Sequence, residues 1–214
     1  TVSGNACQDT NEVGEQDLVL FAVKMFHNAQ VIPSLAPMVG PLTVVLTLQN
    51  GIGSGDVLSM AFGGEKVLLG ATYVEASLTG PGAIREDGGI CRIVFGEESG
   101  QTTTRAVAVD ATLRGAGIPT ELTGDVLSGL WTKLIFICAL SGMTCIARAP
   151  FADVLDTPQT LELTWEVMRE AAEVASSRGI DLDDDRLELL MAECDTVRVG
   201  VVDYKFVRDH LALC

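Results

Sequence analysis

Positive charge is scarce in this chain. Its 214 residues include 14 lysines and arginines against 29 acids, which gives a formal net charge of −15. A nucleic-acid-binding surface needs clustered Lys and Arg to neutralise phosphates, so the charge balance argues against nucleic acid as a partner. Any anionic ligand must therefore be held locally, by backbone amides or by a few placed cations.

Histidines and paired cysteines are also scarce. The only histidines are His27 and His210, and none of the six cysteines forms a CxxC pair. Zinc sites and histidine-based catalytic triads are therefore poorly supported, and we predict no metal site. The cysteines predict reduced, mostly buried thiols in a cytoplasmic protein. They are Cys7, Cys91, Cys138, Cys145, Cys194 and Cys214.

Long apolar runs are missing as well. The longest, from Leu134 to Ala147, is shorter than the ~20 residues that cross a bilayer, and it predicts a buried core helix rather than a membrane span. The chain opens with polar and acidic residues that do not resemble a signal peptide. It also lacks an initiator Met, which suggests a start inside a longer parent protein.

What is present in the first half is an alternation of strand-like and helix-like segments. Continuous apolar runs are typical of strands buried on both faces of a parallel sheet. We expect strands at 17–23, 42–48, 66–74 and 118–122 and helices at 28–39 and 104–115. A turn at residues 87–89 predicts an antiparallel hairpin between short strands at 83–85 and 92–95.

The second half contains no convincing strand. We expect helices at 125–148, 158–178 and 182–194, the second with Pro158 at its start and Gly179 at its end. Strand-like segments end near Thr123 and only helix-like segments follow. This change predicts an α/β domain over residues 1–123 and an all-α domain over residues 124–214.

Two polar residues follow neighbouring predicted strands. Lys24 comes after the first strand and Asn50 after the second. Ligands of open parallel sheets bind outside the carboxyl ends of the strands, where a lysine could meet a phosphate or ribose and an asparagine a polar ring substituent. A solvated lysine and an ordinary Asn-Gly turn are the alternatives.

Lys133 is the third candidate, at the head of an apolar helix. Such a lysine either extends to solvent or points into a cleft, where loss of water lowers its pKa and suits it to proton transfer. The residues alone leave both readings open.

Four segments in order, DLVLFAVK, LQNGIG, GATYVEASLTGPGAI and LWTK, resemble the ketopantoate reductase (2-dehydropantoate 2-reductase) family. The resemblance implies an incomplete Rossmann-type parallel sheet domain that binds NADP, then a helical C-terminal domain for substrate or dimerisation. It further implies reduction of 2-dehydropantoate or a related 2-keto acid to the 2-hydroxy acid, on the route to pantothenate.

The resemblance also implies residue roles. Lys24 would lie near the cofactor, Asn50 would contact its nicotinamide end, and Ala76 would make a backbone contact with it. Lys133 would be the catalytic lysine, donating to the keto oxygen as hydride arrives at the carbon. Ser141 is a weaker candidate for substrate binding.

The sequence departs from the family pattern in three places. No strand with a GxGxxG loop precedes Asp17, so we expect weak or no NADPH binding by the isolated chain. Ile137 and Ser141 stand where the family often has asparagines. The family's late serine and glutamate are not recognisable, and Tyr204-Lys205 is the nearest remnant.

Three hypotheses therefore stay open. The parent protein is a reductase of 2-dehydropantoate or another 2-keto acid, a related hydroxyacid dehydrogenase, or a catalytically incompetent structural or dimerisation module. The partners expected are a small-molecule 2-keto acid and a second copy in a homodimer, with no nucleic acid and no membrane.

Overall fold

The computed structural model describes residues 4–74, 76–86, 91–182 and 185–190. The chain divides into two compact units, Thr1–Val126 and Leu127–Cys214. Among the described residues, the first unit contains the strands and the second is helical, which confirms an α/β fold followed by an all-α region.

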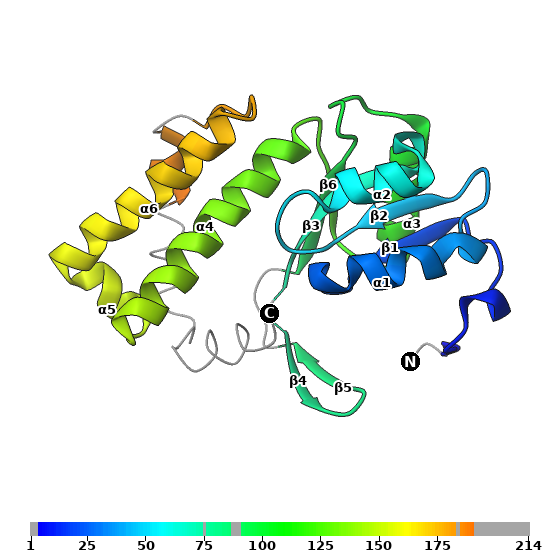
Figure 1. Cartoon of the computed structure of the whole chain (residues 1–214), viewed down its shortest axis with the longest axis horizontal. Coiled ribbons are helices and arrows are strands. Elements are labelled where there is room, and N and C mark those ends of the chain that lie inside the picture. The colour runs from blue at the N-terminus through cyan, green and yellow to red at the C-terminus, as the bar shows by residue number, and fades with distance from the viewer. Residues whose placement is uncertain (1–3, 75, 87–90, 183–184, 191–214) are drawn as a thin grey trace. The chain divides into compact units, whose positions relative to one another are not determined.

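The first unit is built on a five-stranded sheet in the order β1-β2-β3-β6-β7 (Figure 1). β1, β2 and β3 run parallel, β6 is antiparallel to β3, and β7 is parallel to β6. The strands are β1 Leu18–Phe21, β2 Val44–Thr47, β3 Val67–Tyr73, β6 Arg92–Gly96 and β7 Thr120–Leu122. The predicted parallel arrangement of the first three strands is confirmed.

Helices cover both faces of this sheet, which explains why its strands read as continuous apolar runs. On one face α3 (Thr104–Gly115) packs its buried Ala106, Val109 and Leu113 against a cluster that includes Leu46 and Phe95. On the other face α2 (Ser54–Phe62) packs so closely that a Cβ on Gly55 would meet Leu69.

The segment predicted as a short helix at 28–39 is split. One turn of α-helix, α1 (Asn28–Val31), is followed by the 3-10 helix η3 (Ile32–Met38). Pro33 and Pro37 lack the amide hydrogens that a regular α-helix needs, which accounts for the change. Three other short 3-10 helices are η1 Thr10–Glu12, η2 Met25–His27 and η4 Gly64–Lys66.

The predicted hairpin partners are wrong. The strand at 83–86, β5 (Ala83–Glu86), pairs with β4 (Ala76–Gly80), and the strand at 92–96 joins the central sheet instead. Pro81 and Gly82, which has a φ of +69°, form the tight turn between β4 and β5. The predicted turn at 87–89 lies outside the described residues.

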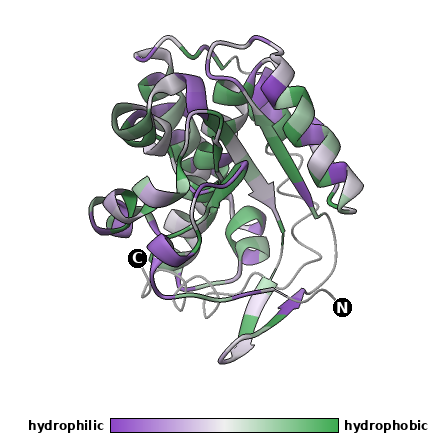
Figure 2. Cartoon of the chain, turned by 90° about the vertical axis from the view of Figure 1, so that its right-hand side faces the viewer, coloured by the Kyte–Doolittle hydropathy of each residue, from purple (hydrophilic) through white to green (hydrophobic). Residues whose placement is uncertain are grey.

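Burial explains this choice of partners. Ile93 and Phe95 of β6 are buried in the central core, whereas the opposed Leu78 and Ile84 of the hairpin are each 75% exposed. The hairpin stands apart from the central sheet in Figure 2 and carries both polar and apolar residues. Burying the more apolar strand stabilises the fold more than a local hairpin does.

The second unit consists of helices in the part that the structure describes. They are α4 Val126–Ala147, α5 Phe151–Asp156, α6 Pro158–Ser176 and a further helical stretch at 185–190. Met143 of α4 forms a buried cluster with Phe151, Val154 and Leu155 of α5. The predicted helix at 158–178 is confirmed, and α5 was not predicted.

α4 confirms the helix predicted at 125–148, and it begins eight residues before the apolar run at 134–147. It has 22 residues, so among the described helices it is the one long and apolar enough to cross a membrane, and 33% of its most apolar window is buried. The length argument against a membrane span is therefore wrong. The packing of Phe136, Leu140 and Met143 with α5 residues shows that one side of α4 belongs to the core of this unit.

The prediction of mostly buried cysteines is also wrong for the four that the structure describes. Cys7, Cys91 and Cys138 are exposed and Cys145 is partly exposed, all as free thiols. Cys7 and Cys91 lie outside the helices and strands, and Cys138 lies on an outer face of α4. Cys194 and Cys214 lie outside the described residues.

Candidate functional site

Lys24 and Asn50 occupy equivalent places after two paired strands. Phe21 ends β1 and pairs in parallel register with Thr47, which ends β2. Lys24 and Asn50 each follow three residues later, and both are exposed. Because carboxyl ends of paired parallel strands meet at one edge of a sheet, the two residues lie on adjacent loops of that edge.

Ala76 extends this pattern to a third strand. β3 pairs in parallel with β2 and ends at Tyr73, and Ala76 again follows three residues later as the first residue of β4. It is partly buried and pairs with Glu86 across the hairpin. The three residues predicted to bind the cofactor therefore follow the carboxyl ends of three successive parallel strands.

The loop that carries Asn50 is shaped by glycines. Gly51 and Gly53 have φ angles of +95° and +88°, which side chains with a Cβ rarely adopt. A Cβ on Gly51 would also lie 3.0 Å from the sulfur of Met25, in the neighbouring loop. The loop is tied back to β2, since the hydroxyls of Ser54 and Thr47 lie 3.0 Å apart.

Two buried amide side chains lie directly beneath these loops. The Nε2 group of Gln49 donates to the Oδ1 atom of Asn28 at 2.7 Å and to the carbonyl oxygen of Val23 at 2.5 Å. Asn28 Nδ2 donates back to Gln49 Oε1 at 3.3 Å. Sequence reasoning missed this pair, although Gln49 stands beside Asn50 in the motif that was singled out.

Lys133 and Ser141 lie in the second unit, on one face of α4. With Ile137 they form a row spaced four residues apart, so Lys133 and Ser141 are about 12 Å apart along the helix axis. All three are partly buried. A separate row, Trp131, Ile135, Ala139 and Met143, is buried.

Burial lowers the pKa of the Lys133 ammonium group from its ordinary value. Loss of water disfavours the charged form of a lysine, and a lysine with a lowered pKa exchanges protons more readily near neutral pH. This is the environment that the catalytic reading of Lys133 requires. That Lys133 faces the same ligand as Lys24 and Asn50 stays a prediction.

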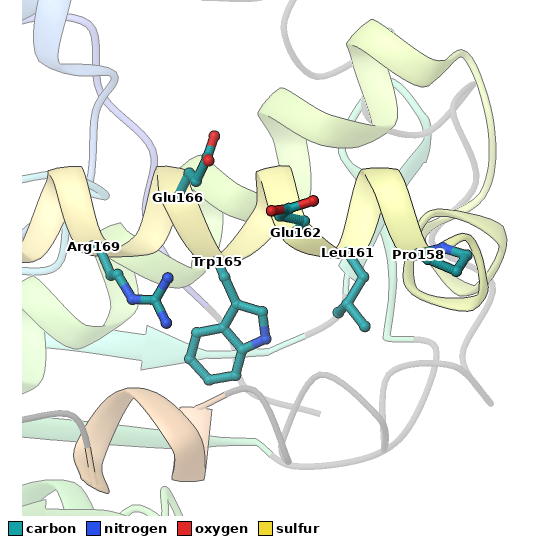
Figure 3. Close-up of a pocket in the computed structure, with 6 residues that line it drawn as sticks. All are labelled: Pro158, Leu161, Glu162, Trp165, Glu166 and Arg169. Carbon is teal, nitrogen blue, oxygen red and sulfur yellow. The ribbon is translucent and has the colours of Figure 1, made fainter.

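The groove of about 380 Å³ shown in Figure 3 contains none of the predicted site residues. All six lining residues come from α6, and the Arg169 guanidinium lies 5.5 Å from the Trp165 ring centre. Glu162 and Glu166 also line it, and their carboxylates disfavour an anionic keto acid. The groove is therefore a poor candidate for the substrate site.

No metal site is found among the described residues, where no three His, Cys, Asp or Glu side chains gather. His27 is exposed and its ring contacts that of Phe26, with the ring centres 4.2 Å apart. His210 and Tyr204-Lys205 lie outside the described residues.

Comparison with known proteins covers both units. The family model described as ketopantoate reductase PanE/ApbA matches residues 2–100, and the model of its C-terminal region matches residues 125–210. An uncharacterised oxidoreductase of Bacillus subtilis, YkpB, is 28% identical over 172 residues, which are 80% of this chain and 57% of that protein. A 2-dehydropantoate 2-reductase of Halobacterium salinarum is 27% identical over 84% of this chain and 59% of its own length.

Among solved structures, the 2-dehydropantoate 2-reductase of Geobacter metallireducens superposes with a TM-score of 0.85 at 26% identity. The match covers 95% of this chain and 68% of that one. The chain spans somewhat less than three fifths of the length of the Bacillus subtilis and Halobacterium salinarum relatives. The two family models together cover most of its residues, in the order of the two units, and the chain belongs to the ketopantoate reductase PanE/ApbA family.

Proposed function

We propose that the whole protein reduces a 2-keto acid, either 2-dehydropantoate or a close analogue, to the 2-hydroxy acid with NADPH. The observation that carries the proposal is the placement of Lys24, Asn50 and Ala76 after three successive parallel strands. In open α/β sheets that edge is where nucleotides bind. Membership of the family supports the same reaction class.

The residues at this edge fit a dinucleotide. Lys24 offers an exposed ammonium group for a phosphate or ribose, and Asn50 offers an amide for the carboxamide of a nicotinamide ring. A Cβ on Gly53 would meet no atom within 4 Å, so the backbone at this position is open to a ligand. When bound, the dinucleotide supplies the hydride.

Lys133 is the proposed proton donor. As negative charge develops on the keto oxygen, the protonated ammonium group stabilises it and then transfers its proton, leaving a neutral amine and a hydroxyl group. The lowered pKa of Lys133 makes this transfer easier than it would be for a lysine in water. The amine is reprotonated from solvent before the next cycle.

The α4 face that carries Lys133 also bears on the choice of keto acid. One turn beyond the lysine stands the apolar Ile137, and two turns beyond stands the hydroxyl of Ser141. The family often has asparagines at these two positions. This face of α4 therefore offers a polar substrate fewer hydrogen bonds than the same face does in the family. We infer a keto acid with an apolar group where the family's substrate is polar.

The test measures NADPH oxidation by the whole protein with 2-dehydropantoate and a panel of 2-keto acids. We expect Lys133→Ala to abolish turnover with the fold intact by circular dichroism, and Lys24→Ala to raise the KM for NADPH. Lys66→Ala is the control, because Lys66 lies at the amino end of β3. Full turnover in Lys133→Ala would remove Lys133 from the mechanism.

The alternative, a structural module without catalysis, predicts no turnover with any keto acid and no NADPH binding by calorimetry. A cytoplasmic location and a homodimer are further expectations from the family. Subcellular fractionation and sedimentation measurements test them.

A further inference from the structure

The reciprocal amide pair of Asn28 and Gln49 joins the two loops of the candidate dinucleotide site. Asn28 begins α1 after the first loop, and Gln49 immediately precedes Asn50 in the second. The pair spans 21 residues of sequence and bonds side chain to side chain in both directions. It is therefore a cross-link between loops and not a local turn.

Gln49 connects this cross-link to both predicted ligand-binding residues. Gln49 donates its second amide hydrogen to the carbonyl of Val23, and Val23 precedes Lys24. The same Gln49 residue is bonded through the chain to Asn50. Gln49 thus fixes the peptide before Lys24 and the peptide before Asn50 at once.

Both members of the amide pair are buried. Asn28 is 7% exposed and Gln49 is 5% exposed, so water does not replace a lost partner easily. Both amide hydrogens of Gln49 are used, and a shorter or longer side chain at either position cannot keep all three hydrogen bonds. A buried polar pair of this kind selects one loop arrangement, because the unpaired alternatives leave polar groups without hydrogen bonds.

We propose that Asn28 and Gln49 are positioning residues that hold Lys24 and Asn50 in the arrangement required for dinucleotide binding. This rests on the proposed function for the identity of the ligand. The side chains act through the backbone of the two loops and do not themselves contact the ligand. Their loss should therefore affect cofactor binding more than the later chemical steps.

The test exchanges the two side chains. Asn28→Gln makes one arm too long and Gln49→Asn makes the other too short, whereas the double variant restores the summed length of the pair. We expect each single variant to raise the KM for NADPH about tenfold in the whole protein with a smaller change in kcat. The double variant should recover part of the loss, because the amide pair re-forms while an asparagine at position 49 does not reach the Val23 carbonyl. A role in general stability alone predicts no split between KM and kcat.

A second readout does not depend on activity. Hydrogen exchange of the 214-residue chain, followed by mass spectrometry, should be about tenfold faster in residues 22–28 and 49–53 of each single variant and partly restored in the double variant. Thr120→Val is the matched control: it removes a buried hydrogen bond to Asp110 at the opposite edge of the sheet. This control should lower the melting temperature and leave exchange in both loops unchanged.

The two readouts separate two kinds of failure. If the wild-type protein does not oxidise NADPH, the proposed function fails, and the exchange measurement still decides the positioning role. Faster exchange confined to the two loops and partly reversed in the double variant supports that role. Unchanged exchange, exchange raised throughout the first unit, or absence of recovery in the double variant overturns it.

Discussion

Arg105 and Glu97 form a partly buried ion pair that joins three parts of the first unit. Arg105 of α3 donates from Nε to Glu97 Oε1 at 2.8 Å, and its Nη2 group donates to Glu97 Oε2 just beyond β6. The same Nη2 group reaches the carbonyl of Val67, at the start of β3, at 3.2 Å. One guanidinium therefore links α3 to two strands of the sheet.

This pair predicts a pH-dependent stability. Burial acts to raise the pKa of the Glu97 carboxyl, but hydrogen bonds from Arg105 and Thr103 and the charge of Arg105 outweigh it, and the pKa is lowered. The contribution of Glu97 is then fully present above the pKa of an unfolded glutamate, about 4.3, and is lost as the pH falls through the folded pKa. Glu97→Gln should flatten this dependence in melting temperatures measured from about pH 6 to 3, whereas Glu97→Ala should cost about 3 kcal/mol at neutral pH.

Glu98→Gln is the control for Glu97, because the neighbouring Glu98 is exposed. It should retain the acid-dependent loss of stability. Equal flattening in both variants would show that the Glu97 pair does not cause the dependence.

Gly96 is predicted to tolerate no side chain. A Cβ at this position would lie 2.2 Å from the carbonyl oxygen of Thr123, and Thr123 is held by the hydrogen bond from its N–H to Phe95. Gly96→Ala should destabilise the chain by about 3 kcal/mol in urea unfolding, since backbone must move to make room. Gly129→Ala, in open space within α4, should instead be neutral or stabilising by about 0.5–1 kcal/mol. Equal stability of the two variants would contradict the close approach of β6 to residue 123.

The pH dependence of turnover tests Lys133 as the proton donor. A donor must carry its proton, so kcat/KM should fall as the pH rises through the pKa of Lys133, which burial lowers. In Lys133→Arg the guanidinium stays protonated, so we expect a rate about a hundredfold lower without that alkaline decline. Lys66→Arg should keep the wild-type profile. An equal alkaline decline of kcat/KM in Lys133→Arg would show that a group other than Lys133 causes the decline.

Ile137 is predicted to set the choice of keto acid. Ile137→Asn places an amide one turn from Lys133 and should raise kcat/KM for 2-dehydropantoate about tenfold while lowering it for keto acids with apolar side chains. The matched control is Cys138→Asn, since Cys138 is the next residue and is exposed on α4. A similar response to both substitutions would show that Ile137 does not contact the substrate.

The features that the sequence could predict are those set by local composition. Continuous runs of apolar and β-branched residues identified β1, β2 and β3 as buried parallel strands, and the start and stop residues located α3 and α6. Placing Lys24 and Asn50 at strand ends followed directly from these runs. The family resemblance then supplied their expected roles and that of Lys133.

Only the tertiary structure decided which groups far apart in the chain become partners. β6 could have paired with β5, but burying Phe95 in the core of the first unit stabilises the fold more. That core is formed by helices and strands that are distant in sequence. The bond between Gln49 and Asn28 likewise exists because two parallel strands end side by side and bury both amides. Local patterns determine which segments form strands and helices, whereas burial and hydrogen bonding over the whole unit determine which of them meet.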